Sequence, residues 1–145
     1  MNTQINVALG GRSYLVHVGA GLIEQAGTLA GDLLRKPTVP VVADARAWKH
    51  LGAGLTDALA AIGKEIALYE VAPGEDSKSW QSLETLTDWM LAQGVERGDH
   101  VIALGGGVVG DLTGFACAVL KPGCGFIQIP RNIFKKRDHN PYRHR

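Results

Sequence analysis

The residues with the clearest chemical potential lie in the stretch 100–115, which reads His-Val-Ile-Ala-Leu-Gly-Gly-Gly-Val-Val-Gly-Asp-Leu-Thr-Gly-Phe. Val101 to Leu104 are typical of a short buried strand, and they lead without a polar linker into Gly105, Gly106 and Gly107. The residues after this turn predict a helix packed against a sheet, with a core face of Val108, Val109, Leu112, Phe115, Ala116 and Val119. Such a junction gathers backbone N–H groups and the positive end of the helix dipole in one small space, so it predicts a diphosphate cradle.

The glycine spacing by itself leaves two interpretations open. Gly105, Gly107 and Gly110 satisfy the G-x-G-x-x-G spacing of dinucleotide-binding turns, but no acidic residue follows about twenty positions later. The same glycines could instead serve only a tight turn between a strand and a helix. Asp111, expected in the first helical turn, suits the helix dipole and could also accept a hydrogen bond from a ligand.

Two further groups of polar side chains follow predicted strands. Asp44 ends the strand predicted over Val39 to Ala43, where a carboxylate commonly binds ribose hydroxyls, although Asp44 would also be a good N-cap. Glu75 and Lys78 lie in the loop after the strand predicted over Glu65 to Val71. They would reach the same crevice as the glycine turn if the sheet is parallel, and a surface ion pair is the alternative.

The elements that must position these side chains alternate along the chain. After a hairpin of Ile5 to Leu9 and Tyr14 to Val18, strands and helices follow one another up to a last strand over Gly125 to Ile129. Three helices are predicted. Their core faces consist of Leu22, Ile23, Ala26, Leu29, Ala30, Leu33 and Leu34; of Ala47, Leu51, Leu55, Ala58, Leu59 and Ile62; and of Trp80, Leu83, Leu86, Met90 and Leu91. Ser77 or Ser79 would cap the third of these helices and Gly94 would end it, and Trp48, Trp80 and Trp89 are interpreted as packing residues. Alternation predicts an α/β fold with a Rossmann-like doubly wound, mostly parallel sheet.

Composition fits one globular domain of 145 residues, with 46% hydrophobic and 20% charged residues. The formal net charge of +1 gives no general argument for a nucleic-acid or membrane partner. Six of the Lys and Arg residues and one acidic residue lie from Arg131 onward, so the preceding residues are mildly acidic and the tail is basic. Cys117 and Cys124 are expected to be reduced, and the chain carries no leader-like or bilayer-spanning run, so we expect a cytoplasmic protein.

Together these pieces resemble the NAD-binding amino-terminal half of the 3-dehydroquinate synthase family. The similarity is carried by Arg12-Ser13-Tyr14 before the Val-Gly-Ala-Gly turn, and by the segments 73–78, 105–115 and 126–130. It implies the following cofactor-binding residues: Asp44 on the adenosine ribose, Glu75 and Lys78 on ribose hydroxyls, Gly106, Gly107 and Val108 along the pyrophosphate, Asp111 facing the nicotinamide end, and Gly74 and Gly110 beside them.

The resemblance also implies a reaction. Family members convert 3-deoxy-arabino-heptulosonate 7-phosphate to 3-dehydroquinate in the shikimate pathway, with elimination of phosphate. NAD serves as a transient oxidant, and a divalent metal, zinc or cobalt, polarises the alcohol that is oxidised. The partner would be a small sugar phosphate, and a homodimer like the family's is compatible with the resemblance. Two alternatives stay open: another sugar-phosphate cyclase or a polyol dehydrogenase relative, and a non-catalytic nucleotide-binding module whose basic tail binds an acidic partner.

The resemblance ends after Pro130. The family continues with a Thr-Thr pair, whereas residues 131–145 are basic and lack apolar periodicity, and Pro122 stands where an arginine is usual. We therefore expect an NAD-binding domain over 1–130 and a disordered basic tail over 131–145. A truncated or out-of-frame chain that is inactive alone would explain this pattern. No residue of the chain is assigned as catalytic or as a metal ligand.

Overall fold

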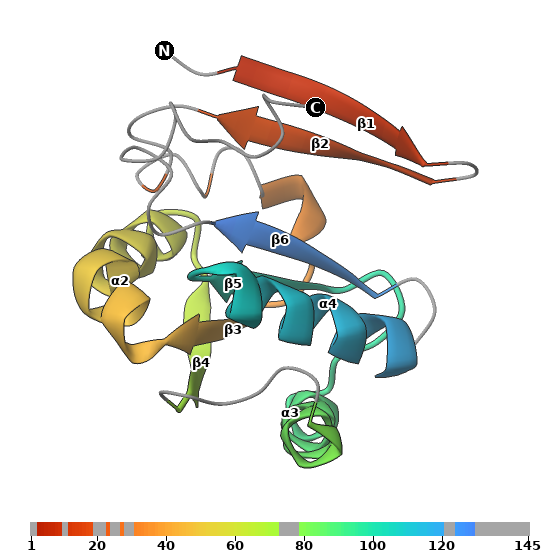
Figure 1. The fold of residues 1–145 in the computed structure, drawn as a ribbon. Helices are drawn as coiled ribbons and strands as arrows, with labels where there is room; N and C mark the ends of the chain where they lie inside the picture. The colour runs from red at the N-terminus through yellow and green to blue at the C-terminus, as the bar shows by residue number, and fades with distance from the viewer. Residues whose placement is uncertain are drawn as a thin grey trace.

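A four-stranded parallel sheet lies at the centre of the computed structural model (Figure 1). The structure describes residues 3–9, 12–18, 23, 27, 31–72, 79–120 and 124–129. The strands of this sheet are β3 (Thr38–Asp44), β4 (Glu65–Val71), β5 (His100–Leu104) and β6 (Gly125–Ile129). They lie in the order β4-β3-β5-β6, and each neighbouring pair is parallel, as the alternation of strands and helices predicted.

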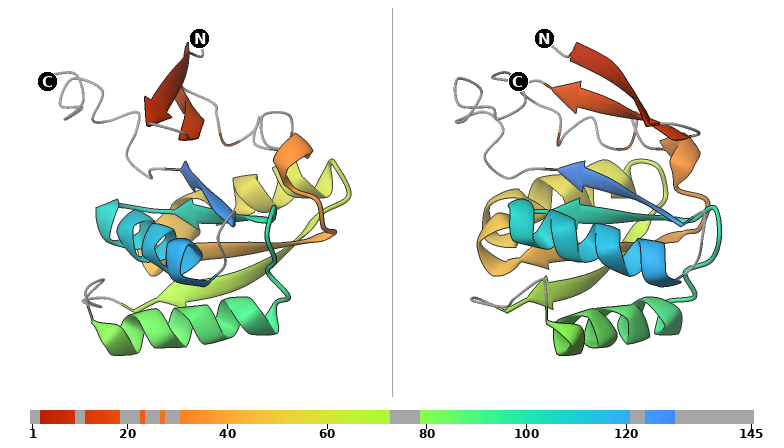
Figure 2. Two further views of the ribbon diagram at one scale, coloured as in Figure 1. Left: turned by 90° about the vertical axis from the view of Figure 1, so that its right-hand side faces the viewer. Right: turned by 45° about the vertical axis from the view of Figure 1, so that its right-hand side comes forward.

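Helices on both faces of the sheet connect these strands (Figure 2). They are α2 (Ala45–Ala60), α3 (Trp80–Ala92) and α4 (Gly107–Leu120). Helix α2 packs on one face of the sheet, whereas α3 and α4 pack against each other and against the opposite face. The predicted doubly wound α/β architecture is therefore confirmed. None of the helices that the structure describes has the length and apolar character needed to cross a membrane.

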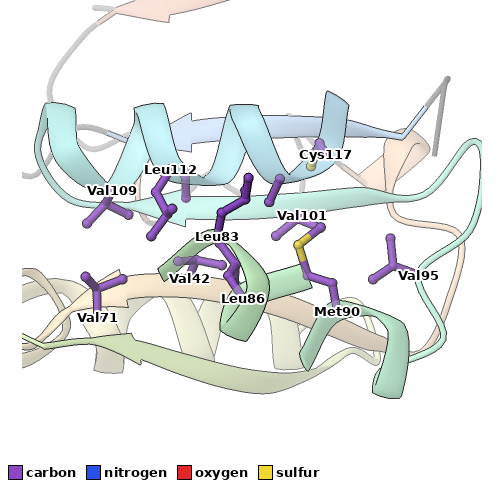
Figure 3. Close-up of a cluster of buried hydrophobic side chains, with 12 residues drawn as sticks. Val42, Val71, Leu83, Leu86, Met90, Val95, Val101, Val109, Leu112 and Cys117 are labelled. Carbon is purple, nitrogen blue, oxygen red and sulfur yellow. The ribbon is translucent and has the colours of Figure 1, made fainter. Parts of the chain in front are cut away.

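The hydrophobic core has two layers because side chains alternate along the central strands. Ile102 and Leu104 of β5 point toward α2, whereas Val101 and Ala103 point toward α3 and α4. Figure 3 shows the second layer, in which side chains of α3 and α4 meet those of the sheet. Strands β3 and β5 are covered on both faces, which explains why their sequences are continuously apolar.

The amino-terminal segment forms a separate two-stranded sheet. Strands β1 (Thr3–Leu9) and β2 (Arg12–Val18) pair antiparallel, with Leu9 opposite Arg12, so the predicted hairpin is confirmed. Most of the helix predicted from Leu22 to Leu34 lies outside the described residues. Its last residues are described, and there Gly31–Leu33 form a 3-10 helix, labelled η1, before β3 begins.

The residues predicted to begin and end the helices are largely confirmed. Asp44 is the N-cap of α2, and Ser79 is the N-cap of α3, where its hydroxyl accepts a hydrogen bond from Ser82 N. Gly94 follows the end of α3 with φ at +77°, a left-handed conformation that favours glycine. Two of the three tryptophans pack as predicted: Trp48 against the first core layer, and Trp89 against the ring of Tyr69.

The predicted core face of α4 is wrong in part. Val109, Leu112 and Ala116 are buried, but the side chains of Val108, Phe115 and Val119 are at least 50% exposed. The buried residues recur at the helical spacings of three and four positions, and the three exposed residues lie on the opposite side of the helix. The helix is apolar almost all round, so its sequence did not indicate which side faces the sheet.

Four more residues assigned to the core are exposed. Leu33 lies in η1, a 3-10 helix, whose side chains are spaced differently from those of the α-helix predicted there. Ile62 lies in the turn after α2, beyond the helical face that covers the sheet. Trp80 is 81% exposed because it is the first residue of α3, one turn before the buried Leu83. Leu91 follows the buried Met90 directly, and a step of one residue turns a side chain about 100° around the helix, away from the core.

Candidate functional site

The sheet has its topological switch point between β3 and β5. The chain leaves β3 for α2 on one face and leaves β5 for α4 on the other, and Ala43 pairs with Leu104 near the carboxyl ends of these strands. Ligands of doubly wound sheets bind outside the carboxyl ends of the strands at such a point. Asp44 and Gly105, which follow this pair, are therefore brought together at the edge where the sequence predicted binding.

Asp44 has one carboxylate oxygen on α2 and the other on the glycine turn. Its backbone is extended, with φ at −81° and ψ at 159°, and its Oδ1 accepts a hydrogen bond from Ala47 N at 2.6 Å. A Cβ atom built on Gly105 would lie 2.6 Å from Oδ2 of Asp44, so that oxygen lies directly against the turn. The predicted capping role is thus confirmed, and ribose binding through Oδ2 stays a prediction.

The glycines of the turn fall into two classes. Gly105 has φ at +147°, and a side chain there would collide with Asp44. A Cβ on Gly110 would overlap the Gln128 amide, but that amide is the end of an exposed, flexible side chain that can turn away. In contrast, a Cβ on Gly106 or Gly107 would meet no atom of the described residues within 4 Å, and neither residue has a positive φ. The described part of the fold therefore explains Gly105 but does not require glycine at 106, 107 or 110.

The open space above Gly106 and Gly107 adjoins the amino-terminal end of α4. The first hydrogen bond of this helix runs from Gly110 N to Gly106 O at 3.1 Å. The amides of Gly107, Val108 and Val109 therefore precede the first helical hydrogen bond and point out of the helix end. Asp44 caps α2, and Ser79 caps α3. The corresponding position before α4 is Gly106, which has no side chain that could accept hydrogen bonds from these amides.

Val108 and Asp111 lie on the exposed side of α4. Val108 is 50% exposed, which leaves it available at the helix end. Asp111 is also exposed, but it is the fifth residue of α4, so the expectation that it belongs to the first turn is wrong. The reason is that the helix begins at Gly107, inside the glycine run, because Gly106 accepts its first hydrogen bond.

The predicted residues Gly74, Glu75 and Lys78 lie outside the described residues. What the structure shows is where their segment is attached. Val71, the last residue of β4, pairs with Asp44, and the next described helix begins at Trp80. The segment therefore leaves the sheet at the same edge, next to Asp44, and the roles of these three residues stay predictions.

Strand β6 fixes the glycine turn in a way that sequence reasoning did not identify. The carbonyl oxygen of Ile129 accepts a hydrogen bond from Gly105 N at 3.0 Å, and the amide of Gln128 lies against Gly110. The Gln128 side chain is exposed, and it lies at the amino-terminal end of α4. The sequence contained one signal for this contact, because the polar Gln128 stands between Ile127 and Ile129. Side chains alternate along a strand, so one face of β6 had to meet α4.

A cluster of charged side chains lies at the opposite end of the sheet, near the start of β5. Asp99 is almost buried; it accepts hydrogen bonds from Arg35 Nη2 at 3.0 Å and Glu96 N at 2.8 Å, and its Oδ2 lies 2.8 Å from Lys36 Nζ. Burial alone would raise the pKa of Asp99, but these partners outweigh it and hold the pKa below its ordinary value of 3.8. The hydrogen bond to Asp99, followed by the one to Glu96, raises the pKa of Lys36. This cluster joins the segment before β3 to the loop before β5.

Comparisons with known proteins point to one family. The family model described as 3-dehydroquinate synthase N-terminal matches residues 68–140. A 3-dehydroquinate synthase of Caulobacter vibrioides is 46% identical over 135 residues, which is 92% of this chain and 36% of that protein. One from Rhodospirillum rubrum is 47% identical over 135 residues, again 92% of this chain and 35% of that protein. The chain thus spans about a third of the length of the curated relatives it matches.

Solved structures agree with this assignment. A 2-epi-5-epi-valiolone synthase from Streptomyces hygroscopicus, with NAD+ and Zn2+ bound, has a TM-score of 0.70 at 30% identity. That comparison covers 85% of this chain and 34% of the other. A 2-deoxy-scyllo-inosose synthase complexed with carbaglucose-6-phosphate, NAD+ and Co2+ has a TM-score of 0.74 at 18% identity, which shows the same fold over 88% of this chain and 35% of that one.

Proposed function

We propose, since the chain belongs to the 3-dehydroquinate synthase family, that its switch point between β3 and β5 is the NAD site of such an enzyme. The proposed activity of the longer protein is the NAD-dependent conversion of 3-deoxy-arabino-heptulosonate 7-phosphate to 3-dehydroquinate with elimination of phosphate. Identities of 46% and 47% to 3-dehydroquinate synthases, against 30% to a valiolone synthase, favour this reaction over that of another cyclase.

The observation that carries the proposal is the open space over Gly106 and Gly107. No atom of the described residues lies within 4 Å of the position that a side chain would take at either residue, and the end of α4 directs its amides there. A diphosphate binds well to such amides because they provide donors and the positive end of the helix dipole. Gly106, Gly107 and Val108 would hold the diphosphate, and Gly110 would let Gln128 pack against the helix beside it.

The acidic side chains around this space would bind the sugar and nicotinamide parts. Asp44 Oδ2 already lies against Gly105, in reach of the turn, and would accept from the adenosine ribose. Asp111 would face the nicotinamide end from the exposed side of α4. Gly74, Glu75 and Lys78 would contribute from the segment that starts beside Asp44, with Glu75 and Lys78 on ribose hydroxyls.

When bound, NAD would supply reversible removal of hydride from a carbinol of the sugar phosphate, which acidifies the neighbouring C–H bond and allows phosphate to leave. The residues named above would bind and orient the cofactor for this reaction. Among the residues that the structure describes, no group of three His, Cys, Asp or Glu side chains could hold a metal ion. We therefore assign no metal ligand and derive no step through a metal in this chain.

The test is NAD binding by the purified chain, measured by isothermal titration calorimetry. Gly107→Ala should weaken binding about tenfold or more, because a methyl group would occupy the space of the diphosphate. Gly31→Ala is the matched control, since its added Cβ would also meet no close contact but lies in η1. Wild-type affinity in a folded Gly107→Ala protein, or no binding by the folded wild-type chain, would contradict the proposal.

A further inference from the structure

Two cysteines converge on one backbone carbonyl group near the start of β6. Cys117 lies in the last turns of α4, where Figure 3 shows it among the side chains of the second core layer, and its residue is 2% exposed. Cys124 directly precedes β6 and is half-buried. Their Sγ atoms lie 3.6 Å and 3.8 Å from the carbonyl oxygen of Gly125. Because both sulfur atoms contact the same oxygen, they are also near each other.

The two thiols are chemically unequal. The hydrogen bond between them, together with burial, raises the pKa of Cys117, whereas the same bond lowers the pKa of Cys124. Burial and the negative charge of Asp99 favour a higher pKa for Cys124, but they do not outweigh the effect of this hydrogen bond. His100, on the neighbouring strand, is a further titratable side chain near this point among the described residues, and it lies against Gly125. Cys124 is therefore the more accessible thiol and the one with the lowered pKa, and Cys117 is its buried neighbour.

We propose that Cys117 and Cys124 form a redox-active dithiol, which a hydroperoxide converts into an intramolecular disulfide between the end of α4 and the start of β6. The Cys124 thiolate attacks one peroxide oxygen, the O–O bond breaks, and Cys124 becomes a sulfenic acid while the second oxygen leaves as an alcohol or water. The Cys117 sulfur then attacks the sulfenic sulfur. The S–S bond forms, the S–O bond breaks, and the hydroxyl group leaves as water with the proton of Cys117.

The balance of this reaction is complete without a further reactant. Two thiols lose two electrons and two protons, and the hydroperoxide is reduced to an alcohol, or water, plus one water. The resulting bond would join the same two elements that fix the glycine turn, since β6 also provides the Ile129 carbonyl to Gly105 and the Gln128 amide to Gly110. The inference rests on the positions of the two sulfur atoms and on their unequal burial and acidity, and it is independent of the proposed NAD site.

The experiment treats the reduced full chain with equimolar hydrogen peroxide at neutral pH and then blocks free thiols with N-ethylmaleimide. We expect a monomer that has lost two hydrogens and takes up no maleimide, and a non-reduced digest in which one peptide pair links Cys117 to Cys124. In Cys117→Ser the sulfenic acid on Cys124 should persist and be trapped by dimedone. Cys124→Ser should remain unmodified over the same time, because Cys117 is buried.

A measurement on the wild-type chain alone keeps the proposal testable if a variant fails to fold. Iodoacetamide should alkylate Cys124 about tenfold faster than Cys117 at neutral pH, because the thiolate is the reacting form. Three results would overturn the proposal: disulfide-linked dimers as the only oxidised product, a stable Cys124 sulfenic acid in the wild-type chain, or equal alkylation rates for the two cysteines.

Discussion

At the scale of single residues, Asp44 caps a helix with one carboxylate oxygen and has its second oxygen at the proposed ligand site. Its Oδ1 caps α2, and its Oδ2 lies against the glycine turn at the switch point. These two roles had been alternatives in the sequence. The structure shows that they are compatible, because the carboxylate has two oxygens and only one of them is used by the helix.

Two substitutions at Asp44 separate these roles. Asparagine is as good an N-cap as aspartate, so Asp44→Asn should change the free energy of unfolding by less than about 0.5 kcal/mol, whereas Asp44→Ala should lower it by about 1 kcal/mol. Both variants should weaken NAD binding about tenfold, because a ribose hydroxyl loses a carboxylate acceptor. Urea unfolding and calorimetric titration measure the two effects. If Asp44→Asn binds NAD as tightly as the wild type, Asp44 serves only as the N-cap of α2 and does not bind the ribose.

At the scale of elements, the Asp99 cluster fixes the loop before β5 to the segment before β3. The pKa of Asp99 is lower in the folded protein than in the unfolded chain, so protons bind more tightly to the unfolded state. The resulting stability is present above the ordinary carboxyl value of 3.8 and is lost as the pH falls through the folded-state pKa. Acid should therefore weaken this connection as the pH falls below 3.8.

Asp99→Asn should remove part of this pH dependence. At pH 7 it should lower the free energy of unfolding by about 1–3 kcal/mol, since it weakens hydrogen bonds to charged partners. Near pH 3 the difference between variant and wild type should shrink, because Asp99 begins to be protonated in the wild type as well. Urea unfolding across this range is the measurement, with Glu84→Gln, an exposed carboxylate on α3, as the control. A difference that is constant with pH would contradict the prediction.

The two sides of α4 offer a second prediction at this scale. Leu112 is fully buried between α4, α3 and the sheet, whereas Phe115 is 55% exposed on the same helix. Leu112→Ala should therefore lower the free energy of unfolding by about 2–5 kcal/mol, and Phe115→Ala by less than about 1 kcal/mol. Chemical denaturation of both variants gives the comparison. A similar large loss for Phe115→Ala would mean that this side of α4 is covered when the chain is folded in solution.

At the scale of the whole molecule, the proposed site joins elements that are distant in the sequence, so a bound ligand should stabilise the fold. Asp44 follows β3, the glycine turn follows β5, and Ile129 of β6 holds the turn in place. NAD at one hundred times its dissociation constant should raise the free energy of unfolding by about 2.7 kcal/mol, if it binds only the folded chain.

This gain is measured by unfolding the chain with and without NAD. Gly107→Ala should lose most of the gain at the same NAD concentration, whereas Gly31→Ala should keep it. An equal gain in all three proteins would place NAD somewhere other than the glycine turn.

The sequence alone determined the parallel α/β fold, the order of its strands and helices along the chain, and most element boundaries. These depend on local signals: apolar runs such as Val101 to Leu104, the caps Asp44 and Ser79, and the stop at Gly94. It also found the strand ends at which the candidate residues lie. Local periodicity is enough for this, because each strand or helix carries its own pattern.

Only the tertiary structure decided which residues meet. The side of α4 that carries Val108, Phe115 and Val119 is exposed, although its sequence is almost as apolar as that of the buried side. Packing against neighbouring elements therefore decided which side faces the core. Likewise, packing against Asp44 explains Gly105, whereas no described residue occupies the space beside Gly106 and Gly107. Such contacts join residues that are far apart in the sequence, and no pattern within one element records them.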